Sequence, residues 1–319
     1  MIFARFLAAV AIGLAAALAF FPALALERWK RVTALLLVYV PIVLAPLAVP
    51  PNARFIRFLA TVISVALLVK LYDLAVGARR GPRPDFRTFA AFLPNIFSMV
   101  FRKLDAEPRP GRTVDLARLS RGLAGLAAWT IILVALFCVD WRGLPFAAEH
   151  SAKVLAFGLA LFAGASVAGA LWRLGGGRGR EFMDAPLVAR TPADFWRRYN
   201  RPTQQFFYED IFKPANGFRA PIRATLLTFA VSALVHEYVF GIVLGRVQGY
   251  QTVFFMLHGC AVAATLRIRP KGWSALLWGA ATLAFNVATA TLFFASVNGM
   301  VPFYSRGLPR WLAGWSLCS

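Results

Sequence analysis

A histidine and a glutamate lie side by side in a segment that is otherwise strongly apolar. The segment covers Pro221–Leu244, and residues 232–239 at its centre read SALVHEYV. Placing one ionisable side chain at the centre of a bilayer costs about 2.5–3.5 kcal/mol on insertion scales. A role in the protein must offset this cost, so His236 and Glu237 are the first candidates for chemistry.

His236 has the properties of a general base. Burial disfavours a charged imidazole, so this side chain is expected to be neutral and able to accept a proton. Such a base contributes about 10²–10⁴ in rate, whereas the structural alternative is a histidine that only bonds a neighbouring helix. Ser232 and Glu237 flank it, and His258 lies in the next apolar segment, so we assign these three residues to a shared substrate cavity. His150 falls in an expected loop and has no evident role.

Metal and serine chemistry fit the sequence poorly. A zinc-protease helix reads His-Glu-x-x-His, but Phe240 stands four residues after His236. Glu237 is rotated by about 100° from His236 on a helix, so we expect it to pair with a polar group on another helix. A metal site formed by both histidines and Glu237 remains an alternative, although we predict no metal. The Gly-x-Ser-x-Gly motif of serine esterases does not occur.

The elements that must position these residues are membrane helices. The 319 residues are 59% hydrophobic, whereas soluble domains are about 45–50% apolar, and a spanning helix needs about 20 mostly apolar residues. We therefore predict an all-α polytopic membrane protein that forms one domain over residues 1–319 and keeps its first helix uncleaved. Eight spans are expected: Phe6–Leu26, Val32–Val49, Phe58–Val76, Leu123–Val139, Val154–Leu171, Pro221–Leu244, Tyr250–Leu266 and Trp273–Ala295.

The net charge of +21 reflects membrane topology rather than nucleic-acid binding. The basic residues concentrate in alternate connections between the spans, as the positive-inside rule requires of cytoplasmic loops. We therefore exclude nucleic acid as a partner and predict that both termini lie outside. A bacterial inner membrane is favoured over the endoplasmic reticulum. The expected cytoplasmic connections are residues 27–31, 79–121, 173–223 and 267–271, and residues 54–57 form a short basic exception.

Two of the expected cytoplasmic loops are long enough to contain helices of their own. In the first, Phe89–Arg102 reads FAAFLPNIFSMVFR and predicts an interfacial helix. In the second, residues 194–214 read DFWRRYNRPTQQFFYEDIFKP, which combines aromatic and basic side chains. Such a composition suits a membrane interface with anionic lipids, and this segment directly precedes the His236 helix.

The two motifs together resemble a known family. The pair FWRRYN (residues 195–200) and SALVHEY (residues 232–238) resembles the signature of the membrane-bound O-acyltransferases, in the branch of wax synthases and of sterol and diacylglycerol acyltransferases. The segment FFMLHGCAV (residues 254–262) is similar to the wax-synthase branch. The resemblance covers residues 194–262. It departs from the branch at Tyr199, where a tryptophan usually precedes the asparagine, and in the short chain.

The resemblance implies acyl transfer from acyl-CoA to an alcohol hydroxyl, in the manner of a wax-ester synthase. His236 would act as general base, and Asn200 would donate to the oxyanion or hold the base. Trp196 and the arginines of the second loop would bind the coenzyme. Acyl-CoA is then a co-substrate and no cofactor is bound permanently, while the other partners are membrane lipids and a lipid or small-molecule alcohol. The arginines are Arg178, Arg180, Arg197, Arg198 and Arg201.

Two other functions remain open. One is transfer of an acetyl group to a glycan or a natural product. The other is a proton-coupled transporter or lipid-handling protein, because intramembrane histidine and glutamate also serve proton relays. Cleavage of a thioester distinguishes the enzymes from the transporter.

Overall fold

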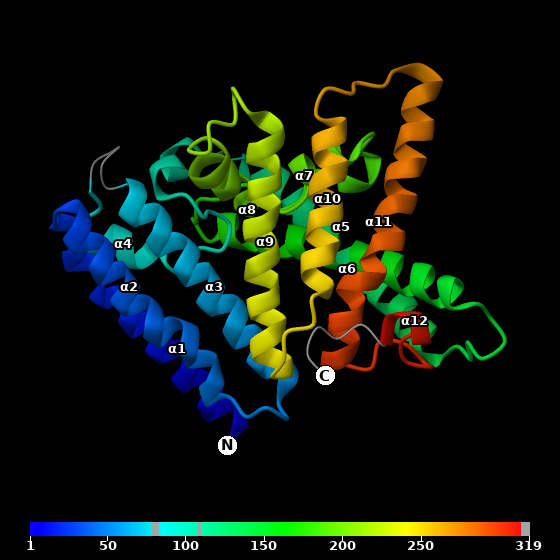
Figure 1. Ribbon diagram of the computed structural model, residues 1–319, viewed down its shortest axis with the longest axis horizontal. Helices are drawn as coiled ribbons and strands as arrows, with labels where there is room; N and C mark the ends of the chain where they lie inside the picture. The colour runs from blue at the N-terminus through cyan, green and yellow to red at the C-terminus, as the bar shows by residue number, and fades with distance from the viewer. Residues whose placement is uncertain (78–82, 108–109, 314–319) are drawn as a thin grey trace.

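The computed structural model describes residues 1–77, 83–107 and 110–313, and every regular element in these ranges is a helix (Figure 1). Eight long helices correspond to the eight predicted spans: α1 (Ile2–Ala19), α2 (Arg28–Leu44), α3 (Arg54–Gly77), α5 (Arg112–Cys138), α6 (Phe146–Leu174), α9 (Pro221–Leu244), α10 (Tyr250–Thr265) and α11 (Gly272–Met300). All except α10 are long and apolar enough to cross a membrane. The prediction of an all-α polytopic membrane protein is therefore confirmed.

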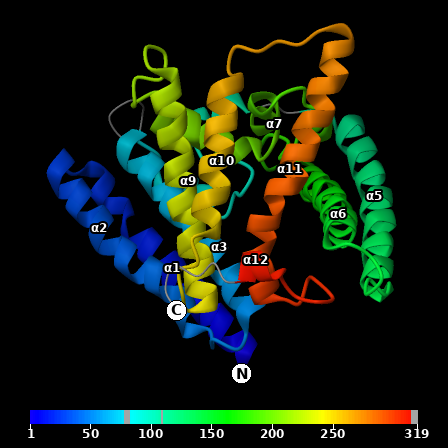
Figure 2. The same cartoon turned by 45° about the vertical axis from the view of Figure 1, so that its right-hand side comes forward.

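Short helices fill the connections at one end of the bundle. This end holds residues 83–107, 175–220 and 267–271, and we call it the basic end. The N-terminus and the short α12 (Arg310–Ala313) lie at the opposite end (Figure 1). A second view shows α5 and α6 on one side of the bundle and α1 and α2 on the other, with α9 and α10 in the centre (Figure 2). The short elements of the basic end include α4 (Phe86–Phe92), α7 (Pro192–Arg198), α8 (Arg201–Phe206) and a π-helical turn (Phe207–Phe212).

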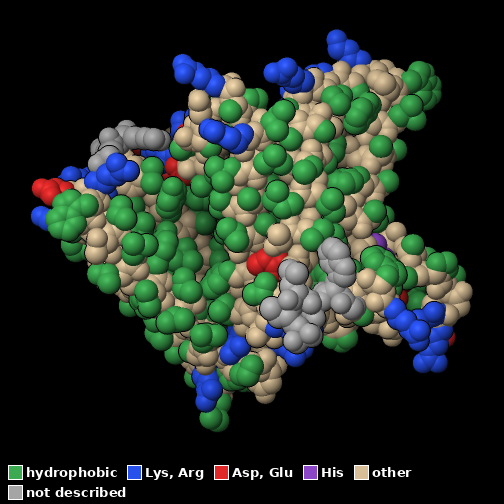
Figure 3. All heavy atoms as spheres, viewed as in Figure 1, with side chains coloured by type: hydrophobic (Ala, Val, Ile, Leu, Met, Phe, Trp, Pro, Cys, Tyr) green, Lys and Arg blue, Asp and Glu red, His purple; other side chains and the backbone are tan. Residues whose placement is uncertain are grey.

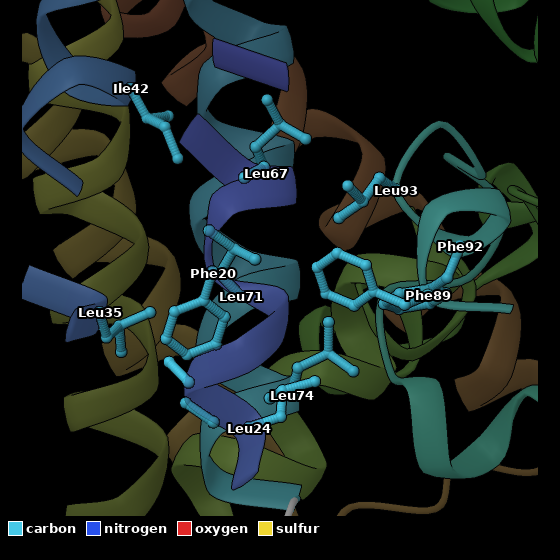
Figure 4. Close-up of a cluster of buried hydrophobic side chains, with 13 residues drawn as sticks. Phe20, Leu24, Leu35, Ile42, Leu67, Leu71, Leu74, Phe89, Phe92 and Leu93 are labelled. Carbon is cyan, nitrogen blue, oxygen red and sulfur yellow. The ribbon is translucent and has the colours of Figure 1, made fainter. Parts of the chain in front are cut away.

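An apolar core joins α1, α2 and α3 to α4 (Figure 4). Phe20 at the end of α1 meets Leu35 of α2 and Leu71 of α3, and all three side chains are buried. Phe89 and Phe92 of α4 join the same core and are at most 1% exposed. The aromatic face of α4 is therefore held by protein and not by the membrane interface.

The predicted interfacial helix over Phe89–Arg102 is only partly present. It begins earlier, because the Asp85 carboxylate caps α4 by accepting a hydrogen bond from the Thr88 amide at 2.7 Å. It ends at Phe92, because Pro94 lacks an N–H group and disfavours helical backbone before it. The prediction of one interfacial helix over Phe89–Arg102 is therefore wrong in its extent.

Lys70 of α3 holds the chain that follows α4. Its ammonium group is fully buried and donates to the carbonyl oxygens of Phe92, Asn95 and Ser98 at 2.7–2.8 Å. The Asn95 amide in turn donates to the Arg178 carbonyl at 2.8 Å. The first loop is thereby tied both to α3 and to the second loop, which leads to α7.

Arg57 explains the basic exception at the opposite end. Its guanidinium donates to the Val49 carbonyl at 2.9 Å and to the Ile242 carbonyl at 3.2 Å. Ile242 belongs to the last turn of α9, where carbonyls lack helical partners and a cation is favourable. This arginine is therefore a structural link between α3 and α9.

Candidate active site

His236 lies on α9 with one ring nitrogen engaged and one free. Its Nδ1 is 2.8 Å from the Ser232 carbonyl oxygen. A carbonyl only accepts, so Nδ1 carries the proton of a neutral ring and Nε2 carries a lone pair. Nε2 has no hydrogen-bond partner within the described ranges. Ser232 is buried, and its contribution to the site is this carbonyl.

Two aromatic rings lie close to the His236 ring. The ring centroid of Phe255 on α10 lies 4.2 Å from that of His236, and the centroid of Phe293 on α11 lies 6.1 Å away. Gly259 allows this close approach of α9 and α10, since a Cβ there would lie 2.8 Å from the Cβ of Phe229. The half-buried imidazole therefore has apolar aromatic neighbours on α10 and α11.

Glu237 has a different task from its neighbour. Its carboxylate accepts hydrogen bonds from the Thr252 amide at 2.9 Å, the Thr252 hydroxyl at 3.1 Å and the Gly249 amide at 3.3 Å. These groups form the first turn of α10, where free N–H groups and the helix dipole favour an anion. Glu237 thus pairs with another helix, as its rotation from His236 indicated, and caps α10 instead of facing the His236 ring.

His258 of α10 is held at both ring nitrogens. The Trp196 indole of α7 donates to its Nδ1 at 2.9 Å, so Nδ1 carries no proton and Nε2–H donates to the Thr289 hydroxyl at 2.8 Å. The Thr289 hydroxyl of α11 in turn donates a hydrogen bond to the Phe285 carbonyl at 2.7 Å. His258 is 1% exposed and joins three elements, and it has no lone pair left to act as a base.

The two histidines are separated by aromatic side chains. Phe255 lies against His236, while Phe254 lies against His258 with centroids 4.3 Å apart. In the part of the chain that the structure describes, no three His, Cys, Asp or Glu side chains come together as metal ligands. The alternative of a metal site with Glu237 thus gains no support from its geometry.

Asn200 forms the turn between α7 and α8. Its backbone is left-handed, with φ 44° and ψ 58°, a conformation that asparagine adopts more readily than most residues. Its Oδ1 caps α8 by accepting from the Thr203 amide at 3.4 Å. Its amide nitrogen has no partner among the described residues. No hydrogen bond links Asn200 to His236; Trp196, on the same turn, contacts Phe255, which in turn contacts His236.

Tyr199, the residue before Asn200, makes three aromatic contacts. Its ring stacks on Phe195 at 5.4 Å and meets Trp196 at 5.6 Å and Phe162 of α6 at 6.1 Å. Burial raises the pKa of its phenol. These contacts hold the residue before Asn200 against α6 and α7.

The arginines of the second loop divide into two groups. Arg197 and Arg198 share the Asp194 carboxylate at 2.6 and 3.0 Å. Burial acts to raise the pKa of Asp194, but these two arginines and the Arg190 amide outweigh it and hold that pKa below its usual value. The Arg201 side chain has no recorded partner within the described ranges, and 60% of the Arg197 side chain is exposed.

Arg178 and Arg180 instead bind the two loops together. They pair with Asp105 and Glu107 of the first loop. Trp196, which the family resemblance assigned to coenzyme binding, points its indole at His258. The sequence contains no signal for these pairings beyond the opposite charges of the two loops, and none for Thr289 or Phe293.

Comparison with known proteins gives two matches. A family model described as the membrane-bound O-acyltransferase family (MBOAT) matches residues 124–294, just over half of the chain. This range runs from α5 to α11 and includes Asn200, His236 and His258. A stretch of 77 residues is 32% identical to "Probable sterol O-acyltransferase 2" of Schizosaccharomyces pombe. That stretch covers 24% of this chain and 16% of the length of the yeast protein.

Proposed function

Because the chain belongs to the membrane-bound O-acyltransferase family, we propose that it transfers the acyl group of an acyl-CoA to an alcohol hydroxyl, with His236 as the general base. The observation that carries this proposal is the state of the His236 ring. Its Nδ1 is fixed by the Ser232 carbonyl, and its Nε2 keeps a free lone pair in apolar surroundings. A base that removes a proton from a hydroxyl needs this arrangement.

The reaction balances with the residues present. Nε2 of His236 takes the hydroxyl proton while the alcohol oxygen attacks the thioester carbonyl. The amide of Asn200, which has no partner among the described residues, stabilises the resulting oxyanion. The intermediate then breaks its carbon–sulfur bond, and the imidazolium returns the proton to the departing thiolate. The products are an ester and the free thiol of CoA.

The coenzyme phosphates bind at the basic end. Arg201 and the exposed Arg197 bind the phosphates, and Asp194 orients Arg197 and Arg198. We assign Trp196 to positioning, because its indole holds α7 against His258. The rings of Phe255 and Phe293 must move to admit the two substrates to His236.

The proposal is tested by the release of CoA thiol. Purified protein is given acyl-CoAs from acetyl to palmitoyl with a panel of long-chain alcohols, sterols and small hydroxyl compounds. We expect one thiol for each ester formed, with a long-chain donor and a fatty alcohol as the best pair. Preference for acetyl-CoA with a glycan or natural product would favour the acetyltransferase alternative. Proton-driven uptake into proteoliposomes without thiol release would contradict the enzyme.

Trp196 and His258 are expected to act as one unit. Trp196→Phe keeps an aromatic ring but removes the N–H donor, and His258→Ala removes the acceptor. A neutral hydrogen bond contributes about 0.5–1.5 kcal/mol, so Trp196→Phe will lower turnover by about 2–13-fold, and His258→Ala, which also loses the bond to Thr289, will lower it at least as far. The double variant will lose little more than His258→Ala alone, because that change already breaks the bond to Trp196.

Removal of metal tests the alternative that the two histidines bind a metal ion. Chelators will leave the wild-type rate unchanged, since His258 binds Trp196 and Thr289. Additive losses in the double variant would contradict a shared role, and one tightly bound zinc per chain by elemental analysis would assign the histidines to a metal instead.

We propose that the basic end faces the cytoplasm of a bacterial inner membrane. Single cysteines are placed at the exposed Arg87 and Arg269 in a chain without native cysteines. They will react with a membrane-impermeant maleimide only in broken cells or inverted vesicles, where the cytoplasmic side is accessible. A cysteine at the exposed Arg142, at the opposite end, will react in intact cells. The reverse pattern would move the proposed coenzyme site to the outer face.

A further inference from the structure

An open groove runs between α9 and α10 near the basic end. Its volume is about 770 Å³. Figure 3 shows this face of the molecule, with hydrophobic side chains over the helices and basic side chains along the upper rim. The groove is lined by Arg219, Ala220, Pro221, Ile222, Arg223, Leu226, Leu227, Ala230, Met256 and Arg267.

The basic side chains of the groove are unpaired. Arg219, Arg223 and Arg267 are exposed, and none has a carboxylate partner within the described ranges. Only Arg223 has a side-chain hydrogen bond, a long one of 3.5 Å to the Ala215 carbonyl. Arg180 of the second loop differs from them, because it pairs with Glu107. The groove thus presents three free guanidinium groups that can bind an anion with several donors each.

The rest of the groove is apolar and lies along the spanning helices. From Arg223 the lining continues through Leu226 and Leu227 to Ala230 on α9, with Met256 of α10 opposite. We call this apolar part of the groove the lane. At 1.5 Å per residue, it extends about 10 Å along α9 from Arg223. It opens sideways from two helices that cross or enter the bilayer, so a ligand reaches it from the lipid.

We propose that this groove binds an anionic phospholipid. The phosphate group lies among Arg219, Arg223 and Arg267, and one acyl chain follows the lane to Ala230. The charge at one end and the apolar walls beyond it match such a lipid, and the sideways opening admits it from the bilayer. The groove arginines are different residues from the proposed coenzyme arginines of α7 and α8, and the proposal is independent of the proposed reaction.

Binding is measured by native mass spectrometry of purified protein in detergent. The protein is titrated with phosphatidylglycerol and with phosphatidylcholine of the same chains. We expect a clear preference for phosphatidylglycerol. Each basic residue near an anionic lipid contributes about fivefold to binding, so the triple variant Arg219→Gln/Arg223→Gln/Arg267→Gln will lose up to about 100-fold of this affinity.

Two further variants separate charge from shape. Arg28→Gln/Arg87→Gln/Arg112→Gln removes the same charge from exposed positions away from the groove, and it will keep the preference. Ala230→Trp fills the apolar part of the groove without changing the charge, and it will lower the affinity for phosphatidylglycerol by about tenfold or more. Size-exclusion profiles and thermal unfolding establish whether each variant is folded. If the triple variant is unfolded, the lipid preference of the wild type and the effect of Ala230→Trp still test the proposal.

Three results would overturn the proposal. The first is equal binding of the two lipids by the wild type, and the second is an equal loss in the control triple variant. The third is displacement of phosphatidylglycerol by a non-hydrolysable acyl-CoA analogue, together with loss of analogue binding in the groove triple variant. That third result would assign the groove to the acyl donor.

Discussion

Replacing His236 with alanine will lower the release of CoA thiol by about 10²–10⁴-fold, the contribution of a positioned general base. The loss will appear in turnover at saturating donor, because the imidazole acts on the alcohol proton and makes no contact with the coenzyme in the proposed reaction. Insertion and folding will be retained, since the change removes a polar group from a membrane helix. Thiol release and ester formation are measured together on purified protein.

His258→Ala is the matched control for this experiment. It also removes a buried imidazole, from the adjacent helix, but that ring has no free lone pair and its variant will keep measurable turnover. Near-normal thioester consumption by His236→Ala would remove His236 from the chemistry. Loss of activity in His258→Ala and its retention in His236→Ala would exchange the two roles.

The spans were predictable because each is a continuous apolar run, and burial in a bilayer depends mainly on such runs. The short elements of the loops were not. Phe89 and Phe92 look like membrane-facing residues in the sequence, but they pack into the core of α1–α3. A short stretch of sequence shows which residues are apolar but not which distant residues they contact. It therefore could not distinguish side chains that face lipid from side chains that pack against protein.

The histidine residues show the same limit. His236 was singled out because an ionisable side chain is costly in an apolar segment, and its role as the base stays a prediction. His150 was placed in a loop without a role, yet it lies in α6 and is buried, 2.7 Å from the Tyr304 hydroxyl and 2.7 Å from the Val287 carbonyl. His258 was placed in a cavity, but its partners Trp196 and Thr289 come from remote elements. Pairings between distant helices leave no local periodicity in a sequence.

Glu237 shows what a residue pair can hide. The adjacent letters His and Glu suggested one shared site, whereas a helix turns each residue by about 100° and sends the two side chains to different neighbours. Glu237 reaches the first turn of α10, so it determines how α9 and α10 are joined. The hydrogen bonds of Glu237 to the end of α10 therefore offset the cost of placing it in the membrane. The proposed chemistry accounts for the presence of His236.

Asn200 requires a more careful substitution than His236, because its side chain has two tasks. Alanine would remove the cap of α8, which costs about 0.5–2 kcal/mol, and would strain the left-handed backbone by about 1–2 kcal/mol. A loss of activity in Asn200→Ala could then come from a displaced turn. Asn200→Asp avoids both problems, because aspartate tolerates this backbone and keeps an Oδ1 acceptor for the Thr203 amide.

Asn200→Asp will lower turnover by about 10²–10³-fold, the usual effect of removing one oxyanion donor, while the unfolding temperature stays close to that of the wild type. Asn200→Gly is the matched control for the backbone: it adopts the left-handed turn freely, loses only a few tenths of a kcal/mol as a cap, and lacks the amide, so its turnover will fall as far. Steady-state rates across donor concentrations separate the possible roles. Wild-type turnover in Asn200→Asp would reduce Asn200 to a helix cap, and a change confined to KM for the donor would make it a binding residue.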